Sequence, residues 1–279
     1  MARKRLTQLF PFLLPLRRWQ KKRCFYLKMR LDRNRYAAQL AKTRLPYPVF
    51  EDAFTVINPE SGYDITYQYN KAHNLKLAAA TMDGLVIAPG ETYSFWMLCR
   101  YADKKTPYKP GLSLVDGKIR GVYGGGLCQL SDLVLWLVLH TPLTIVERHP
   151  HTVKDFPAPG MPEGVDATVS EGWLDLKVRN DTQQSYQLLL DFPDELIRGR
   201  ILCSEKPRYD YCLRIDGPRY FTTQGKVYER ADVYRARLDP STGEGLEEKL
   251  LYKSCNHVGY HLPVGEGRCI HRCYRASIK

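Results

Sequence analysis

The segment 124–138 constrains the fold of this chain more than any other part of its sequence. Three consecutive glycines at 124–126 lead into Cys128, and an apolar run follows that continues almost unbroken to His140. A helix without a polar face has to lie inside the protein, and Thr141-Pro142 is a natural end for it. The sequence therefore predicts a central buried helix over 127–140, entered through a glycine-rich turn.

The period of the apolar residues changes in the second half of the chain. Leu174, Leu176 and Val178 alternate with charged residues, which predicts a half-buried strand. The segments 227–238 and 246–254 flank a loop at 239–245 and predict a hairpin. A helix is also expected over 69–82, before the turn at Asp83-Gly84. Helices in the first half and strands in the second predict an α+β fold, with the central helix packed on a mainly antiparallel sheet.

The positive charge of the chain is concentrated at its start. Residues 1–35 hold twelve Lys or Arg and one acid, so they contribute +11 of the total net charge of +12. The apolar piece at 9–16 is far shorter than the roughly 20 residues that span a bilayer, and no small-residue cleavage site follows it. We therefore expect a cytoplasmic protein, or one peripheral to the inner face of the membrane.

Two interpretations of this basic segment stay open. Charged flanks around Trp19, Phe25 and several leucines suit an anchor on an anionic membrane surface. Alternatively, it is a solvated arm that packs a few apolar residues on its own domain. Nucleic acid is the least favoured partner, and the oligomeric state leaves no signal in the sequence.

Cys128 is the candidate nucleophile. A thiol at the start of a helix has its anion stabilised by the helix dipole and the free backbone N–H groups, and the thiolate is the reactive form. His149 and His151 follow after a little more than twenty residues and are candidate bases. The alternative is a buried packing cysteine beside a purely architectural glycine turn.

Five motifs in a fixed order connect this sequence to a known family. They are Pro89-Gly90-Glu91-Thr92-Tyr93-Ser94-Phe95, Gly124-Gly125-Gly126-Leu127-Cys128-Gln129, Glu147-Arg148-His149-Pro150-His151, Gly164-Val165-Asp166-Ala167-Thr168-Val169 and Arg179-Asn180-Asp181-Thr182. Over roughly residues 70–190 the chain resembles the VanW family. The resemblance implies a cell-envelope protein associated with glycopeptide (vancomycin) resistance. It divides the chain into a basic arm (1–45), a VanW-like domain (46–205) and a β-rich extension with a Cys/His tail (206–279).

The resemblance also implies a site, because some larger VanW-like proteins look like cysteine L,D-transpeptidases. Cys128 would attack a carbonyl of a peptidoglycan stem peptide or precursor. The base would be His151 or His149; we favour His151, since the intervening Pro150 disfavours both imidazoles facing one way. Asp166 would orient the base. Backbone N–H groups after Gly126, those of Cys128 and Gln129, would form the oxyanion hole. The competing interpretation is a non-catalytic, membrane-associated binding or assembly factor in cell-wall metabolism.

Two features depart from the family pattern. Asp132 stands where the family commonly has Thr, one turn of helix after Cys128, and an unpaired carboxylate there would raise the pKa of the thiol. Peptidoglycan strands lie outside the cell, whereas no clear export signal precedes this domain.

The cysteines and the tail carry no strong metal signal. Eight cysteines scattered over 279 residues predict reduced thiols rather than a disulfide scaffold. The tail gathers six potential ligands, of which only Cys269 and Cys273 have the spacing of a zinc pair; the others are Cys255, His257, His261 and His271. We expect no metal and no cofactor, with a zinc site in the tail as the alternative.

Overall fold

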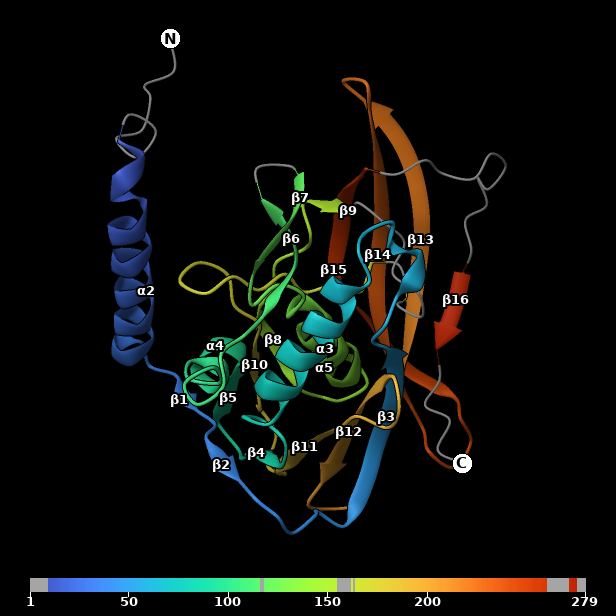
Figure 1. Ribbon diagram of the computed structural model, residues 1–279. Coiled ribbons are helices and arrows are strands. Elements are labelled where there is room, and N and C mark those ends of the chain that lie inside the picture. The colour runs from blue at the N-terminus through green and yellow to red at the C-terminus, as the bar shows by residue number, and fades with distance from the viewer. Residues whose placement is uncertain (1–9, 116–117, 155–161, 163, 260–270, 275–279) are drawn as a thin grey trace.

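The chain has an α+β fold, as predicted. The computed structural model describes residues 10–115, 118–154, 162 and 164–259, together with the backbone of 271–274. Within these residues lie four α-helices and two short 3-10 turns (Figure 1). The helices are α2 (Leu14–Leu31), α3 (Thr66–Ala79), α4 (Phe95–Cys99) and α5 (Cys128–Leu139), and the turns are η1 (Pro11–Leu13) and η2 (Pro59–Ser61).

The strands form three larger sheets and one hairpin. The first sheet has the order β1 (Arg35–Tyr36), β5 (Glu91–Ser94), β10 (Lys177–Arg179), β8 (Thr144–Glu147). The second has the order β2 (Gln39–Leu40), β4 (Leu85–Ile87), β11 (Tyr186–Asp191), β12 (Leu196–Cys203), β3 (Tyr47–Thr55). The third has the order β16 (His271–Tyr274), β13 (Asp210–Thr223), β14 (Lys226–Leu238), β15 (Gly245–Val258), β9 (Val153–Lys154). The hairpin pairs β6 (Pro110–Val115) with β7 (Lys118–Tyr123).

Antiparallel pairing dominates, and the described strands pair in parallel only at β1–β5 and β9–β15. The second of these pairs is important for the site. Strand β9 comes directly after the histidine motif, so β15 lies alongside the chain that carries His151. The hairpin predicted over 227–254 is present as β14 and β15.

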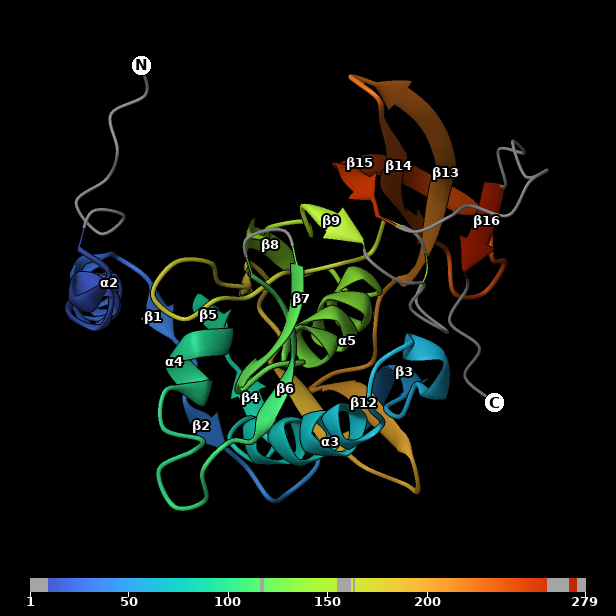
Figure 2. The same ribbon diagram turned by 45° about the horizontal axis from the view of Figure 1, so that its top comes forward.

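Helix α5 lies at the centre of the molecule, with α3 beside it (Figure 2). Nine of its twelve residues are buried, and it packs on the second sheet, which is antiparallel throughout. Gly199 in β12 permits this close approach, because a Cβ there would lie 2.4 Å from a methyl carbon of Leu137. The predicted central helix after a glycine turn is therefore confirmed.

The strand expected over 174–179 is wrong in extent. Only Lys177–Arg179 forms β10, and Asp175, which alternation would place in solvent, is fully buried. Its carboxylate accepts hydrogen bonds from the Ser94 hydroxyl at 2.6 Å and from the Trp96 backbone N–H at 3.1 Å. These bonds turn the chain inward before the strand begins, so a buried polar contact overrides the period of two.

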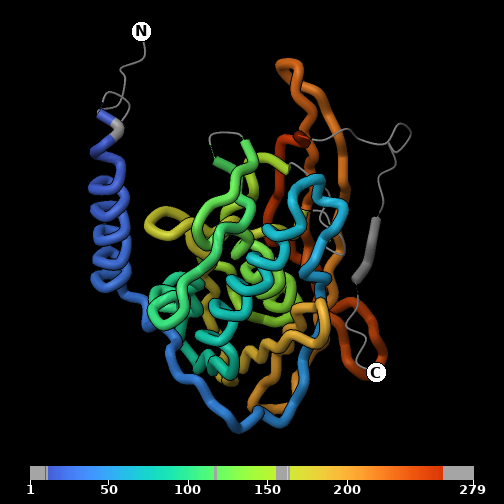
Figure 3. The backbone as a smooth tube through the Cα atoms, in the orientation of Figure 1, coloured from blue at the N-terminus to red at the C-terminus, as the bar shows by residue number. Residues whose placement is uncertain are grey.

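Helix α2 stands apart from the rest of the molecule (Figures 1 and 3). Its attachment centres on Glu171, which accepts from the Tyr26 hydroxyl at 2.7 Å and pairs with Lys22 at 2.8 Å. Pro15 does not break the helix, because it lies in the first turn, where its missing N–H costs no hydrogen bond. None of the described helices is long and apolar enough to cross a bilayer.

Candidate functional site

The glycine turn before α5 has an architectural reason. Gly124 and Gly126 adopt positive φ angles of 70° and 91°, which other residues rarely tolerate. Gly125 packs against the backbone of Gly111, and a Cβ on it would lie 2.1 Å from the Gly111 carbonyl oxygen. The buried Asn74 of α3 fixes the turn by donating to the Gly125 carbonyl at 3.0 Å. The turn sets the position at which α5 starts.

Cys128 is the first residue of α5 and is half-buried. Its sulfur lies 3.8 Å from the Val169 carbonyl oxygen. Among the described residues its backbone N–H has no hydrogen-bond partner, as expected in the first turn of a helix. The N–H of Gln129, the second predicted oxyanion donor, is already bonded to the Gly126 carbonyl at 3.3 Å. The amide of Cys128 itself is thus the available donor at this site.

His151 lies between the thiol and a carboxylate. Its Nδ1 is 3.1 Å from Oδ2 of Asp166, and the same oxygen accepts the His151 backbone N–H at 2.5 Å. The Cys128 thiol also acts on this ring and favours its protonated form. Burial lowers the pKa of His151, but the hydrogen bond to Asp166 and the influence of Cys128 outweigh it and hold this pKa well above its usual range. The side chain remains 31% exposed, so it can exchange protons with a substrate or with water.

Asp166 is buried and kept ionised by its neighbours. Arg148 donates to its Oδ1 through Nη2 at 2.6 Å and to its backbone carbonyl through Nε at 2.7 Å. Burial alone would raise the pKa of this carboxyl, yet the bonds to His151 and the charge of Arg148 lower it to about 2. The carboxylate can therefore hold the imidazole of His151 in one orientation.

The structure separates the two candidate histidines. His149 Nε2 lies 3.0 Å from Oε1 of Glu147, whose other oxygen pairs with Lys177 at 2.9 Å. The His149 backbone carbonyl accepts from Thr168 N–H at 2.7 Å, which fixes the two motifs side by side. Of the two imidazoles, the one at 151 therefore interacts with the thiol and Asp166, and the one at 149 with Glu147.

Asp132 is paired rather than free beside the thiol. Its Oδ1 accepts the backbone N–H of Ala167 at 2.6 Å, so it fastens α5 to the segment that carries Asp166. Burial raises the pKa of this carboxyl to about 7, against the opposing influence of His151 and the Ala167 N–H. The neighbouring Ser131 donates to the Ala167 carbonyl at 2.6 Å. Asp132, which departs from the family pattern, thus contributes a structural hydrogen bond at the site.

Four residues that sequence reasoning assigned no role support the pair His151–Asp166. The guanidinium of Arg148 stacks on Tyr252, 3.9 Å from the ring centroid. The hydroxyl of Ser254 lies 3.3 Å from both Arg148 Nη2 and Asp166 Oδ1. With its side-chain amide in the orientation that satisfies its neighbours, Asn256 donates to the His151 carbonyl at 3.1 Å. Arg148 belonged to a recognised motif, whereas nothing in the pattern of β15 indicated which segment it would face.

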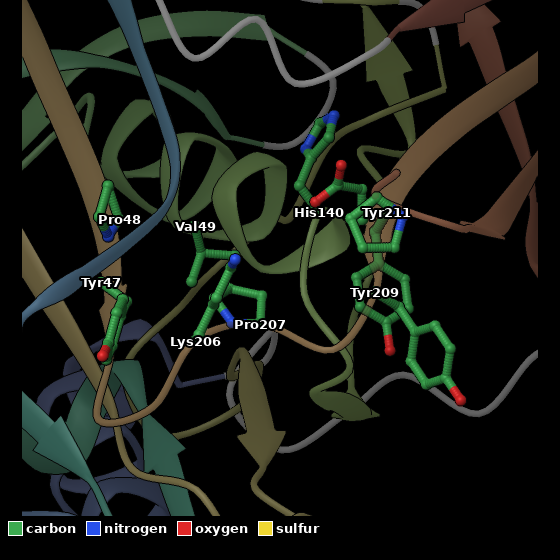
Figure 4. A pocket seen from close by; sticks show the side chains of 10 residues that line it. Tyr47, Pro48, Val49, His140, Lys206, Pro207, Tyr209 and Tyr211 are labelled. Carbon is green, nitrogen blue, oxygen red and sulfur yellow. The ribbon is translucent and has the colours of Figure 1, made fainter. Parts of the chain in front are cut away.

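A separate cavity of about 240 Å³ lies at the other end of α5, where His140 caps the helix (Figure 4). Its lining is rich in tyrosine and proline, including Tyr47, Tyr209 and Tyr211, and contains neither Cys128 nor His151. A twelve-residue helix is about 18 Å long, so this cavity is remote from the thiol. It does not belong to the candidate site.

The described residues contain no cluster of three His, Cys, Asp or Glu side chains that could hold a metal ion. His261 and Cys269 of the predicted tail alternative lie outside the described residues, as do the side chains of His271 and Cys273. Cys24, Cys99, Cys128, Cys203, Cys212 and Cys255 are all free thiols.

Comparisons with known proteins place these residues in context. Residues 70–202 match the family model described as VanW-like protein. The vancomycin B-type resistance protein VanW of Enterococcus faecalis is 49% identical over 265 residues, which cover 94% of this chain and 96% of that protein. The uncharacterized protein YoaR of Bacillus subtilis is 35% identical over 115 residues, or 41% of this chain and 37% of that protein. No solved structure matches the chain significantly.

Proposed function

The chain belongs to the VanW family, and from that premise we propose that it is a cysteine acyltransferase of glycopeptide resistance acting on peptidoglycan-type peptides. The observation that carries the proposal is the hydrogen bond between His151 Nδ1 and Asp166, on an imidazole that the Cys128 thiol at the start of α5 also influences. A thiol, an imidazole and a buried carboxylate in this order are the parts that thiol-based acyl transfer requires. The relative named for vancomycin B-type resistance supplies the biological setting.

The first half-reaction forms a thioester. With Nδ1 held by Asp166, the remaining nitrogen of His151 accepts the thiol proton. The Cys128 thiolate then attacks a stem-peptide carbonyl carbon, and the carbonyl oxygen becomes an oxyanion facing the Cys128 amide. As the amide C–N bond breaks, the His151 imidazolium returns the proton to the leaving amine. The acyl group is left on sulfur.

The second half-reaction releases the acyl group. An amine of an acceptor stem attacks the thioester carbonyl, and His151 takes up the proton that the amine loses. The C–S bond breaks, an amide forms, and the thiolate–imidazolium pair is restored. Asp166 stays ionised throughout, since its pKa of about 2 is far below neutral pH. Its role is to hold the imidazole and to stabilise the imidazolium.

The chemical test is intact-mass analysis after incubation with tetrapeptide-stem muropeptides. We expect an acyl adduct on Cys128 that a nucleophilic amine removes, and no thioester on Cys128→Ser. His151→Ala should slow iodoacetamide alkylation of Cys128 at neutral pH by about 10- to 100-fold, because the base is lost. His149→Ala is the matched control and should leave that rate unchanged. A thiol that resists iodoacetamide from pH 6 to 9 and forms no adduct would contradict the proposal.

We further propose that α2 binds the surface of an anionic membrane, because its free face combines apolar and basic side chains. Leu16, Trp19, Leu27 and Leu31 are each more than half exposed, and at 100° per residue they lie within one third of the helix circumference. Tyr26 and Met29, which are buried against the body, lie outside that stripe. Basic residues flank it, and Arg23 within it stacks on Trp19 at 5.0 Å. Such a face suits the interface of anionic lipid.

Vesicle flotation of the full chain tests the membrane proposal. Vesicles with phosphatidylglycerol should bind the protein, and pure phosphatidylcholine vesicles should not. Binding should weaken as salt rises from 0.05 to 0.5 M, because screening shortens the reach of the charges. Trp19→Ser with Leu27→Ser should weaken binding more than Leu246→Ser, which removes an exposed leucine elsewhere. Absence of binding to either kind of vesicle would contradict the membrane proposal, and equal binding to both would contradict the role of the basic residues in it.

A further inference from the structure

The strongest unassigned feature of the site is its dependence on the third sheet. The family model ends at residue 202, yet the carboxylate, the arginine and the histidine backbone all contact β15, at residues 252–256. Each of these contacts joins β15 to a residue of a motif that lies much earlier in the sequence. The segment that matches the family therefore contains the reacting groups without all of the groups that hold them.

The contacts fall on one face of the strand. Ser254 and Asn256 are buried, whereas Lys253 and Cys255 between them are exposed, as the alternation of a strand requires. The buried face meets the histidine segment, and the backbone adds to it, because His257 N–H donates to the Thr152 carbonyl at 3.1 Å. The side-chain contacts and the backbone hydrogen bonds together align β15 with the residues that follow His151.

We propose that Tyr252, Ser254 and Asn256 are positioning residues that hold the His151–Asp166 pair in register with Cys128. The ring of Tyr252 stacks on the guanidinium of Arg148, and this guanidinium binds Asp166. Ser254 bridges the arginine and the carboxylate. Asn256 holds the His151 carbonyl. This inference rests on the proposed function for its chemical meaning, but the positioning itself is measurable without catalysis.

The test follows the titration of His151 by NMR in the full chain, in a Cys128→Ser background and in the wild type. Because Asp166 holds the proton on His151, loosening the carboxylate should lower the titration midpoint toward the ordinary value. Ser254→Ala and Tyr252→Leu should each lower it by about 0.5 to 1 pH unit.

Matched controls lie on the same strand. Tyr252→Phe keeps the ring under Arg148 and removes a hydroxyl that has no partner among the described residues, so the midpoint should not move. Lys253→Ala changes the exposed face and should also leave it unchanged. Folded Ser254→Ala and Tyr252→Leu variants with a midpoint within about 0.2 unit of the parent would overturn the proposal. If Tyr252→Leu does not fold, Ser254→Ala decides, since it removes a single oxygen atom.

The two proposals fail in different ways. If no thioester forms but the midpoint shifts as expected, β15 positions a histidine that serves another purpose, and the acyltransferase proposal is wrong. If the thioester forms and the midpoint does not respond to β15, the reaction stands and the third sheet has no positioning role.

Discussion

Helices α2 and α5 differ in how much of each is buried and in how each is attached to the rest of the protein. Nine residues of α5 are buried, and its position is fixed by the second sheet and by a glycine turn that admits no side chain. In α2 only Tyr26 and Met29 are buried, and one acidic residue, Glu171, anchors two of its side chains. Packing along most of its length holds α5 in place, whereas α2 is held by two buried side chains and by the contacts with Glu171. Helix α5 therefore places Cys128 at a fixed point, whereas α2 leaves most of its surface exposed.

The largest expected difference between the helices is in stability. Leu133 of α5 is fully buried, and Leu133→Ala should lower the free energy of unfolding by about 2–5 kcal/mol through lost transfer energy and a residual cavity. Leu27 of α2 is 55% exposed, and Leu27→Ala should change it by less than about 0.5 kcal/mol. Urea denaturation followed by circular dichroism measures both. Similar losses in the two variants would contradict the comparison.

A smaller effect should depend on pH. The ordinary pKa of Asp132, 3.8, is raised to about 7 in the folded protein, so folding favours the protonated form between these values. Stability contributed by that proton is present at low pH and is lost as pH rises from about 4 to 7. Asp132→Asn keeps a hydrogen-bond acceptor for Ala167 without the charge. It should raise the free energy of unfolding by about 2 kcal/mol at pH 8 and by less at pH 5.

Paired urea titrations at pH 5 and pH 8 measure this difference, and the exposed Glu244→Gln serves as the control that should show none. If Asp132→Asn raised the free energy of unfolding as much at pH 5 as at pH 8, burial of the Asp132 charge would not be the cause of the increase. The pH dependence of stability that Asp166 contributes has the opposite sign, because the pKa of Asp166 is lowered to about 2. The stability it contributes is present above pH 4 and is lost as pH falls toward 2.

The smallest expected effect concerns the attachment of α2. Glu171→Gln removes the ion pair with Lys22 and keeps an acceptor for the Tyr26 hydroxyl. A partly exposed pair is worth less than about 1 kcal/mol, so the unfolding of the body should hardly change. Limited trypsin digestion should nevertheless cut within 17–30 severalfold faster. High salt should have the same effect on the wild-type protein and little on the variant.

Sequence patterns predicted the parts of this molecule that depend on local or periodic signals. The run after Cys128 is apolar on all sides and could only be central, and the segments around 239–245 formed the expected hairpin. The position of His149 and His151 after Cys128 made both candidate bases, and the structure brings His151, rather than His149, to Asp166. The burial of Asp175 was missed, because its partners Ser94 and Trp96 lie about eighty residues away.

The supporting groups of the site were beyond prediction for the same reason. Ser254 is 88 residues from Asp166 and 106 from Arg148, and strand alternation says which residues share a face without saying what that face meets. Pro15 gave a misleading signal in the opposite sense. It interrupts the apolar piece at 9–16 as a sequence, yet in space it occupies the first turn of α2, where it is tolerated.

The late position of β15 has a consequence for how the protein is made. A ribosome releases Cys128 and both histidines well before residues 245–258 emerge, and strand pairing over such separations is slow compared with local helix formation. The nascent chain therefore carries a thiol and an imidazole that no third sheet yet aligns. Alignment arrives only after residues 245–258 have been synthesised. A truncated product from an interrupted message would keep the cysteine and both histidines and lose the strand whose side chains contact Arg148 and Asp166.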